Sequence, residues 1–475
     1  MGTTCIRKAD WAVVWDRAAK THRYARDVDV AFEEDRIVFV GADYSGECDA
    51  ELDGRALCIM PGLVNIHCHP TSQPLTRGVR EEMGNPLLYS SALYNRTGLW
   101  QTDDDGLIAG AEVGLSELLL SGVTTVLDYP QRIPAGWIDA LARSGLRAFC
   151  APTFADARWV VEGESKVGYE WDEAAGRDQF EQAMTLVEAA DRHPSGRLSG
   201  VVAPAQVDTC TERTLTESYR IATDRQCMWQ VHAAQSLSEF HEMTQRHGLT
   251  PVQWLDSLGV LGSNSTLGHC IFIDEHPWAH WTSKRDLSTL VERGTTVAHC
   301  PTVFSRYGHV MHSVGGYIRA GVNVGIGCDT APHNMLEEMR QAIILSRVAA
   351  GQMDDVYVRD IFNAATVGGA RALGRDDIGR LDEGCKADIV LLDLSHPQMR
   401  PNRDPLRNLV FTAADRAVRD VFVDGRCVVK QGEVQTMDLA AATSRLEAAQ
   451  RAAEADVPAR DPLSRSGQEV SPLVF

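Results

Sequence analysis

Five side chains that can bind a metal ion or carry a proton stand at the ends of separate short apolar segments. His67 and His69 close one segment, and His232 and His269 close two others. Asp329 follows a fourth segment. If these segments are strands, residues two apart face the same side, so His67 and His69 can point into one site.

Imidazoles combined with one carboxylate are suited to a particular chemistry. Three or four histidines and an aspartate can hold a divalent ion such as Zn²⁺ and leave a position for water, whose pKa then falls to roughly 7. A carboxylate beside the ion can take a proton from that water and pass it to a leaving group. A lone histidine is more often a satisfied part of the core, but candidates at the ends of four separate segments favour a metal site.

The cysteines are better suited to packing in the core than to binding a metal ion. The same alternation turns Cys68 away from its histidine neighbours, and it turns Cys270 and Cys328 outward beside His269 and Asp329. None of the 12 cysteines is spaced as Cys-x-x-Cys, so no zinc knuckle is expected.

Eight short apolar segments can serve as the strands that position these residues. Helix-length segments such as 106–121 lie between them, and eight strand–helix units predict a (β/α)₈ TIM-like barrel. A doubly wound sheet is the alternative, but no Gly-x-Gly-x-x-Gly follows the first strand. The eight segments are 62–67, 123–128, 146–151, 198–203, 228–232, 265–269, 295–299 and 322–326.

Both ends of the chain carry short β-type segments. Residues 27–40 alternate apolar and charged positions, and similar stretches occur at 386–393 and 421–429, where Asp424-Gly425 is a hairpin signal. We therefore predict a small β-sandwich domain built from both termini. The predicted division is 1–60 with 378–438 for this domain, 61–377 for the barrel, and 439–475 for an Ala-rich helix (439–456) and a loosely held tail.

Composition excludes several classes of partner. The net charge of −19, from 46 basic and 65 acidic residues, opposes binding to nucleic acid or to acidic membranes. No run approaches 18 apolar residues and the first 20 residues lack a signal-peptide core, so the expected compartment is the cytoplasm. We expect a small-molecule substrate, no nucleic-acid or membrane partner, and a homo-oligomer (a dimer or higher).

Several longer motifs occur in order between about residues 27 and 435. As a set, they resemble the amidohydrolase superfamily, in the branch that holds cytosine and guanine deaminases, chlorohydrolases and s-triazine hydrolases. The motifs are PGLVNIHCH at 61–69, LTRG at 75–78, SGVTTVLD at 121–128, VQWLD at 252–256, GHC at 268–270, AHCP at 298–301, GIGCD at 325–329 and IGRLDEGCKADI at 378–389.

The resemblance implies that His67, His69, His232 and Asp329 are metal ligands. His269 would contact the reacting groups or serve as a further ligand. Many superfamily members bridge two metals with a carbamylated lysine at the end of strand four, but none of the six lysines here ends a central strand. We therefore predict one divalent transition metal per chain, with Zn²⁺ first and Fe, Co or Mn as alternatives.

The substrate pocket departs from the pattern of the family. In the deaminases of this branch, a glutamate three residues after the strand-five histidine protonates a ring nitrogen. Here Gln235 stands at that position, and Gln206 ends a strand-four segment where Pro-His is often found. An amide can donate a hydrogen bond but cannot transfer a proton at neutral pH.

Two enzymatic functions are therefore predicted, and a third possibility is a barrel whose metal is only structural. The first is hydrolysis of an amide, urea or (thio)carbamate, because DTAPHNMLEEMR at 329–340 looks most like the molinate and phenylurea hydrolases. The alternative is an aminohydrolase or chlorohydrolase acting on a purine, pyrimidine, pterin or s-triazine ring. In either reading Asp329 and His269 are the candidate catalytic residues.

The remaining candidates concern the walls of the pocket. Gln235, His269, His299 and His333 are candidate substrate contacts. Tyr89, Tyr94 and Trp100 lie in the loop region after strand one and could wall an apolar pocket. The pair Glu337-Glu338 is expected on the solvated face of a helix.

Overall fold

The computed structural model describes residues 2–81, 98–162 and 166–475, with Tyr89 and Tyr94 outside the described residues. Its central strands form two four-stranded parallel sheets, in the orders β14-β10-β9-β8 and β16-β17-β18-β19. These strands are β8 (Leu63–Cys68), β9 (Val123–Asp128), β10 (Arg147–Cys150), β14 (Leu198–Gly200), β16 (Trp229–Ala233), β17 (Ser265–His269), β18 (Thr296–His299) and β19 (Val324–Ile326).

Isolated bridges join the two sheets at both edges. Val202, just after β14, pairs with Trp229 of β16, and Cys68 of β8 pairs with Asp329, just after β19. The pairings therefore run in a closed ring, and the carboxyl ends of all eight strands face the same end of it. Each strand lies within two residues of its predicted position, except that β14 is shorter than the predicted 198–203.

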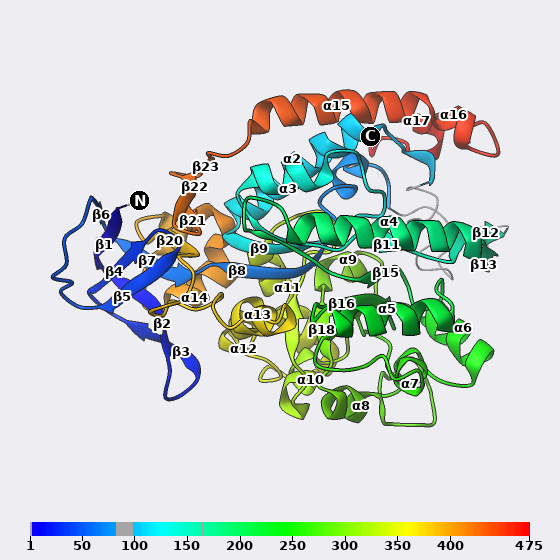
Figure 1. Ribbon diagram of the computed structural model, residues 1–475, viewed down its shortest axis with the longest axis horizontal. Coiled ribbons are helices and arrows are strands. Elements are labelled where there is room, and N and C mark those ends of the chain that lie inside the picture. The colour runs from blue at the N-terminus through cyan, green and yellow to red at the C-terminus, as the bar shows by residue number, and fades with distance from the viewer. Residues whose placement is uncertain (1, 82–97, 163–165) are drawn as a thin grey trace.

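Helices cover the outside of this ring, and they lie around the strands in Figure 1. Polar caps define where several of them begin: Asp103 accepts a hydrogen bond from the Gly106 N–H at the start of α2. The helices are α2 (Asp104–Leu120), α3 (Trp137–Ser144), α4 (Glu173–Asp191), α5 (Glu212–Asp224), α6 (Leu237–His247), α7 (Pro251–Ser257), α8 (Asp286–Arg293), α9 (Pro301–Arg306), α10 (Val314–Ala320), α11 (Met335–Ala350), α12 (Val358–Asn363) and α13 (Gly369–Ala372). Two further pairs of short strands are present. β11 (Thr153–Phe154) pairs with β15 (Ala203–Pro204), and β12 (Ala157–Glu162) forms a hairpin with β13 (Lys166–Trp171).

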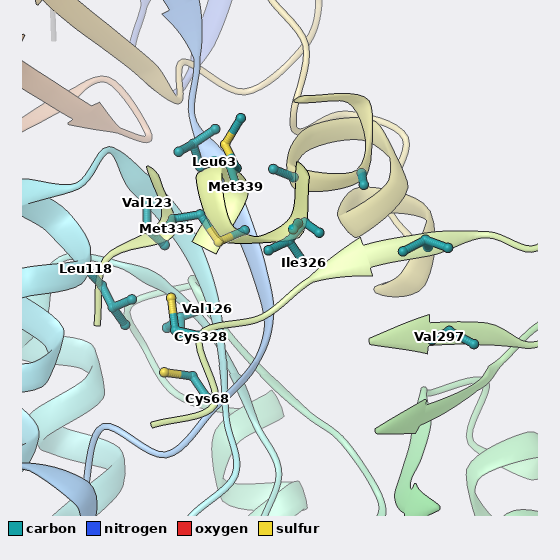
Figure 2. Close-up of a cluster of buried hydrophobic side chains, with 14 of the residues drawn as sticks. Leu63, Cys68, Leu118, Val123, Val126, Val297, Ile326, Cys328, Met335 and Met339 are labelled. Atoms are coloured by element: carbon teal, nitrogen blue, oxygen red, sulfur yellow. The ribbon is translucent and has the colours of Figure 1, made fainter. Parts of the chain in front are cut away.

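The core lies between the strands and the helices. Every residue of β8, β9, β16 and β17 is buried, as expected for parallel strands covered on both faces. Cys68 and Cys328 belong to this core, and Figure 2 shows them in a cluster with Leu118, Val126 and Met335. Cys270 is also fully buried, and burial raises the pKa of its thiol. These cysteines pack in the core, as their alternation with the histidines predicts.

Strands from both ends of the chain form two further sheets. One has the order β5-β4-β1-β6, and the other has the order β23-β22-β21-β20-β7-β2-β3. The two sheets share a buried apolar cluster that includes Ile6, Phe32, Ile59 and Leu391. The strands are β1 (Thr3–Ala9), β2 (Trp11–Asp16), β3 (Thr21–Ala25), β4 (Val28–Glu33), β5 (Arg36–Gly41), β6 (Ala50–Asp53), β7 (Leu57–Pro61), β20 (Ile389–Asp393), β21 (Val418–Val423), β22 (Arg426–Lys430) and β23 (Glu433–Val434).

The C-terminal segment is more firmly packed than the sequence predicts. Helix α15 (Leu439–Ala455) is followed by α16 (Val457–Arg460) and α17 (Gly467–Val470). Val457 and Val470 are buried against Leu99 and Trp100. The prediction of a loose tail over 457–475 is therefore wrong for the part that includes these two valines. The segment is mostly polar, so its sequence does not indicate that two apolar side chains hold it in place. Leu473 to Phe475 are exposed. Trp100 belongs to this packing.

A buried arginine connects the ring of parallel strands to the terminal sheets. Arg147, at the start of β10, lies 3.3 Å from Asp388 and 2.5 Å from Asp424, and only 2% of its side chain is exposed. Lys386 lies 3.6 Å from Asp424 and therefore partly shares that carboxylate. Among the ion pairs of the described residues, Asp388 pairs with Arg147 and with no other cation. Arg147 therefore balances the charge of Asp388 where the ring of strands meets the terminal sheets.

Replacing Arg147 with Met is expected to lower the free energy of unfolding by about 3–5 kcal/mol, because the buried Asp388 carboxyl would lose its cation beside Asp424. Urea denaturation measures the change. The control is Arg55→Met, which breaks the exposed pair with Asp53 and should cost less than about 1 kcal/mol. Equal losses in the two variants would contradict a special role for Arg147.

Candidate metal site

The structure brings five predicted residues together at the carboxyl ends of the strands. Ligand atoms of His67, His69 and His232 lie within 4.8 Å of one another, as do those of His67, His269 and Asp329. Asp329 Oδ1 lies 3.0 Å from His69 Nε2 and 3.7 Å from His67 Nε2. All five side chains are buried. His67 belongs to both groups, and its ring contacts those of the other three histidines, as does the ring of His232.

The backbone at two of these residues is in an unusual conformation. His269 has φ of 85° and Asp329 has φ of 56°, a region that non-glycine residues adopt at a cost of about 1–3 kcal/mol. Both residues stand where a central strand gives way to a loop. Their conformation turns the side chains toward the shared centre, and such strain is concentrated at functional sites in proteins.

Hydrogen bonds fix the orientation of three imidazoles. His67 Nδ1 lies 2.8 Å from Gln230 Oε1, and His232 Nδ1 lies 2.6 Å from the carbonyl oxygen of Ala205. His69 Nδ1 contacts the carbonyl oxygen of Tyr129. Because Nδ1 of His67 and of His232 faces an acceptor and so carries the proton, their Nε2 atoms present lone pairs to the centre of the site, the arrangement typical of metal-ligating histidines. His69 differs, since its Nε2 lies 3.0 Å from Asp329 Oδ1 and its hydrogen bond to that carboxylate raises the pKa of His69 despite burial.

The unpartnered atoms of the site fit a divalent ion. His67 Nε2 and His269 Nδ1 are buried, and neither has a hydrogen-bond partner within the described part of the chain. Nitrogen donors with one carboxylate suit zinc and similar divalent transition metals. Lys166 begins β13 of a hairpin and so does not end a central strand. The number of metal ions per chain stays a prediction.

Burial keeps most of these imidazoles neutral. It lowers the pKa of His67 to about 4, and it lowers the pKa values of His232 and His269 well below their usual range. Burial opposes ionisation of Asp329, but the hydrogen bond to His69 and the surrounding histidines outweigh it and hold the pKa of that carboxyl well below its usual range. Neutral imidazoles and an ionised carboxylate are the forms that bind a metal.

Two glutamines lie beside His232. Gln235 Nε2 donates a hydrogen bond of 2.5 Å to Gln206 Oε1, and both side chains are half-buried. Gln206 is also bridged to His232 through the backbone. The predicted substrate contact Gln235 is therefore placed next to a metal-ligand candidate, with an amide partner on the neighbouring strand.

The other two predicted substrate contacts lie in different surroundings. His299 ends β18 and is close enough to His269 to influence its pKa. His333 is fully buried, and its Nδ1 lies 3.5 Å from Glu117 Oε2 and 3.4 Å from Arg77 Nη2. The structure thus places His333 in a charged network with α2, and its contact with substrate stays a prediction.

The structure corrects one prediction and adds one residue to the site. Glu338 is fully buried and its Oε2 accepts a hydrogen bond from the Thr302 N–H, so the expectation of a solvated pair at Glu337-Glu338 is wrong for Glu338. Helical spacing alone does not reveal that α9 covers this face of α11. The added residue is Gln230, which is buried behind His67; its position two before His232 on the same strand is a signal that could have indicated it.

Gln230 is expected to strengthen metal binding through His67. It accepts from His67 Nδ1 and donates to the Ile66 carbonyl oxygen at 3.1 Å. Gln230→Leu removes both contacts at similar volume, and we expect metal affinity to fall by roughly 10–100-fold, as for other residues that orient a ligand. Competition with a chelator measures the affinity. An unchanged affinity would mean that packing alone orients His67.

The family of the protein follows from comparison with known proteins. Residues 58–428 match the model of the Amidohydrolase family, so the chain belongs to this family and is a hydrolytic enzyme that cleaves C–N bonds. Two curated relatives extend over nearly the whole chain. A 5-methylthioadenosine/S-adenosylhomocysteine deaminase of Natronomonas pharaonis is 30% identical over 436 residues (90% of this chain and 93% of the relative). A 5'-deoxyadenosine deaminase of Methanothermobacter thermautotrophicus is 28% identical over 417 residues (86% and 91%).

Solved structures share the fold. An adenosine deaminase from Xanthomonas campestris with bound zinc has a TM-score of 0.78 and 23% identity, covering 95% of this chain and 98% of that one. The atrazine chlorohydrolase of Arthrobacter aurescens with zinc has a TM-score of 0.80 and 22% identity, covering 94% and 100%. The resemblance to the deaminase and chlorohydrolase branch is thereby confirmed. A phenylurea or thiocarbamate substrate, and with it a role in xenobiotic degradation, gains no support, and the names of the relatives favour the predicted alternative.

Proposed function

We propose that this enzyme hydrolyses the bond between a heteroaromatic ring carbon and its exocyclic substituent, with purines and related rings as the substrate class. The observation that carries the proposal is the buried cluster of four histidines and Asp329, in a chain that matches nucleoside deaminases over about nine tenths of its length. This replaces urea or carbamate hydrolysis as the leading function.

His67, His69, His232 and Asp329 would hold one metal ion, with zinc as the first candidate and His269 as a fifth ligand or a contact of the reacting groups. A divalent ion in this position supplies Lewis acidity and brings the pKa of water toward neutrality. Asp329 accepts the proton of the attacking water and delivers it to the departing group. The ionised state of Asp329 supports the first of these steps.

A cavity of about 560 Å³ offers space for substrate near the site. Ala331 and Pro332, just after Asp329, line it together with Gln73 and the cationic side chains of Arg77 and Arg306. Gln73 also follows the metal-ligand candidate His69, whose carbonyl oxygen accepts a hydrogen bond from the Gln73 N–H. We propose that the part of the substrate remote from the reacting carbon occupies this cavity.

Cleavage of a urea or carbamate remains the second candidate because of one observation. Gln235 and Gln206 present amides where a proton donor is expected for a ring substrate, and amides suit a neutral carbonyl compound. The test is an activity panel with the zinc-loaded protein. Adenosine, 5'-deoxyadenosine, guanine, cytosine and a hydroxytriazine represent rings, and a phenylurea and a thiocarbamate represent carbonyl compounds. Turnover of rings supports the proposal, whereas turnover of only the carbonyl compounds supports the second candidate.

The remaining proposals concern organisation. We propose that the ring of strands is a (β/α)₈ barrel over 61–377, that 1–60 and 378–438 form a β-sandwich domain, and that the chain forms a homo-oligomer in the cytoplasm without nucleic-acid or membrane partners. In the described residues, each helix is either too short or too polar to cross a bilayer. Light scattering of the purified protein tests the oligomer.

A further inference from the structure

A larger cavity, of about 730 Å³, lies apart from the metal site. It is bordered by β2 and β3 of the terminal sheet, by α11 and α12, and by α14 (Pro405–Asn408) with the turn that follows it. Asn363, the last residue of α12, lines it, and the next segment, Ala364–Gly368, places Gly368 against Val324 at the start of β19. The metal-ligand candidates stand at the carboxyl ends of the strands, so this cavity, at their amino ends, is separate from the substrate site.

Apolar side chains form much of the wall of this cavity. Phe362 and Leu406 are buried in it. Met353, Tyr357 and Phe411 line the same cavity but are 82%, 47% and 39% exposed. Large apolar side chains that gather in one exposed place mark a binding surface. The volume lies within the roughly 300–1,000 Å³ that is typical of pockets for small molecules.

The polar part of the lining is mainly cationic. Four arginines and two aspartates line the cavity, whereas the whole chain has a net charge of −19. One of the aspartates, Asp404, accepts hydrogen bonds from the Tyr24 hydroxyl at 2.7 Å and from the Arg407 N–H at 3.2 Å. His22 also lines the cavity, and burial lowers its pKa to about 3, so its imidazole is neutral. The cavity is therefore positively charged in an acidic protein. Its arginines are Arg23, Arg347, Arg359 and Arg407.

Arg347 differs from the other three arginines because its charge is not balanced. Its Nε and Nη2 donate to the carbonyl oxygen of Val356 at 3.1 and 2.9 Å, so the half-buried guanidinium is held in one orientation. Within the described ranges of the chain, no carboxylate forms an ion pair with it and its Nη1 makes no hydrogen bond. A guanidinium that is fixed but unpaired is suited to binding an anion. The other three pair with Asp16, Asp360 and Asp404 at 3.5, 3.4 and 3.2 Å.

We propose that this cavity binds a small organic anion with a flat apolar body, such as an aromatic carboxylate or sulfonate. The anionic group pairs with Arg347, and the ring covers the exposed apolar side chains of Met353, Tyr357 and Phe411. The Asn363 amide, which makes no hydrogen bond to another described residue, supplies a further donor. The proposal concerns a second site and does not rest on the proposed function.

A second copy of the chain matches this cavity less well. Identical chains most often pair about a two-fold axis, which places the same surface of both chains in contact. The positively charged lining would then face a second positively charged lining. A separate anion satisfies the apolar wall and the unpaired cation together.

Calorimetric titration of the purified full chain with naphthalenesulfonate tests the site. We expect about one molecule to bind per chain. Methyl naphthyl sulfone, a neutral compound of similar shape, should bind roughly 10–100-fold more weakly, because it lacks the charge that pairs with Arg347. Arg347→Met should weaken binding of the sulfonate by a similar factor and leave binding of the sulfone unchanged. Arg213→Met removes an exposed arginine of α5 and should alter neither affinity.

A second variant tests the cavity without disturbing the contact between Arg347 and Val356. Met353 is largely exposed, so the fold should tolerate Met353→Glu. The added carboxylate competes for the cationic lining and repels the ligand, and we expect the affinity for the sulfonate to fall by roughly 10-fold. Val348→Glu makes the matched change on α11 at an exposed residue that does not line the cavity, and it should leave the affinity unchanged.

Three results would overturn the proposal. The first is failure of the unmodified protein to bind the sulfonate, and the second is equal affinity for the sulfonate and the sulfone. The third is unchanged affinity in both Arg347→Met and Met353→Glu. If the sulfonate does not bind, and light scattering shows an oligomer that Met353→Glu and Val348→Glu both dissociate, this face is an interface between copies of the chain. None of these results bears on ring hydrolysis, which is measured at the metal site.

Discussion

Replacing His67 with Ala is expected to remove the metal and reduce activity to the background of the assay. His67 belongs to both groups of ligand atoms, the one with His69 and His232 and the one with His269 and Asp329. Its loss deletes one donor and leaves a void between the others. Elemental analysis should find about one equivalent of metal per unmodified chain, the stoichiometry predicted from one donor set, and far less in the variant.

The control for this experiment is His241→Ala, which removes an exposed histidine on α6. It should keep its metal and its activity. Two equivalents per active chain would contradict the single-metal prediction. Full metal retention in His67→Ala would show that the remaining donors suffice, and His69→Ala would then be the next variant to measure.

Replacing Asp329 with Asn is expected to lower kcat by roughly 10²–10⁴, the usual range for a positioned acid–base group. The amide keeps a similar shape and one oxygen donor, but it cannot accept the proton of water and return it. The histidines should retain much of the metal, so the loss in kcat should exceed the loss in occupancy. Steady-state kinetics alongside elemental analysis separates the two effects.

An exposed aspartate provides the comparison for Asp329. Asp354→Asn makes the same chemical change on the surface and should leave kcat unaltered. If Asp329→Asn retains its metal and turns over at the normal rate, another group moves the proton. His269 is then the first residue to test, because its ligand atom lies in the same group as those of His67 and Asp329.

The sequence predicts the central strands well for a physical reason. Strands such as β9 and β17 are buried on both faces, so their apolar runs are continuous and easily distinguished from the amphipathic helices between them. The metal-ligand candidates share this advantage, since each stands at the end of such a run. His67 and His69 are further connected by the two-residue period of a strand.

What the sequence leaves open depends on contacts between distant segments. The burial of Glu338 requires α9 to pack on α11, and the network of His333 requires Glu117 of α2 to lie beside it. Neither neighbour is indicated by local periodicity. The sequence also leaves open the choice between ring and carbonyl substrates. In the sequence, Gln235 is a single residue that differs from the family pattern, and only the structure shows that its side chain is hydrogen-bonded to Gln206.

The seven-stranded sheet has a consequence for synthesis of the protein in the cell. β7 pairs with β20, where Pro61 lies opposite Ile389, so the partner of β7 is translated roughly 330 residues later. At about 5–20 residues per second, the ribosome needs on the order of 20–60 s to supply it. Throughout that interval the apolar edge of β7 is unpaired and can join a strand of another nascent chain. This sheet therefore closes only after β20 has been made, and we expect a chaperone that shields the N-terminal strands to increase the yield.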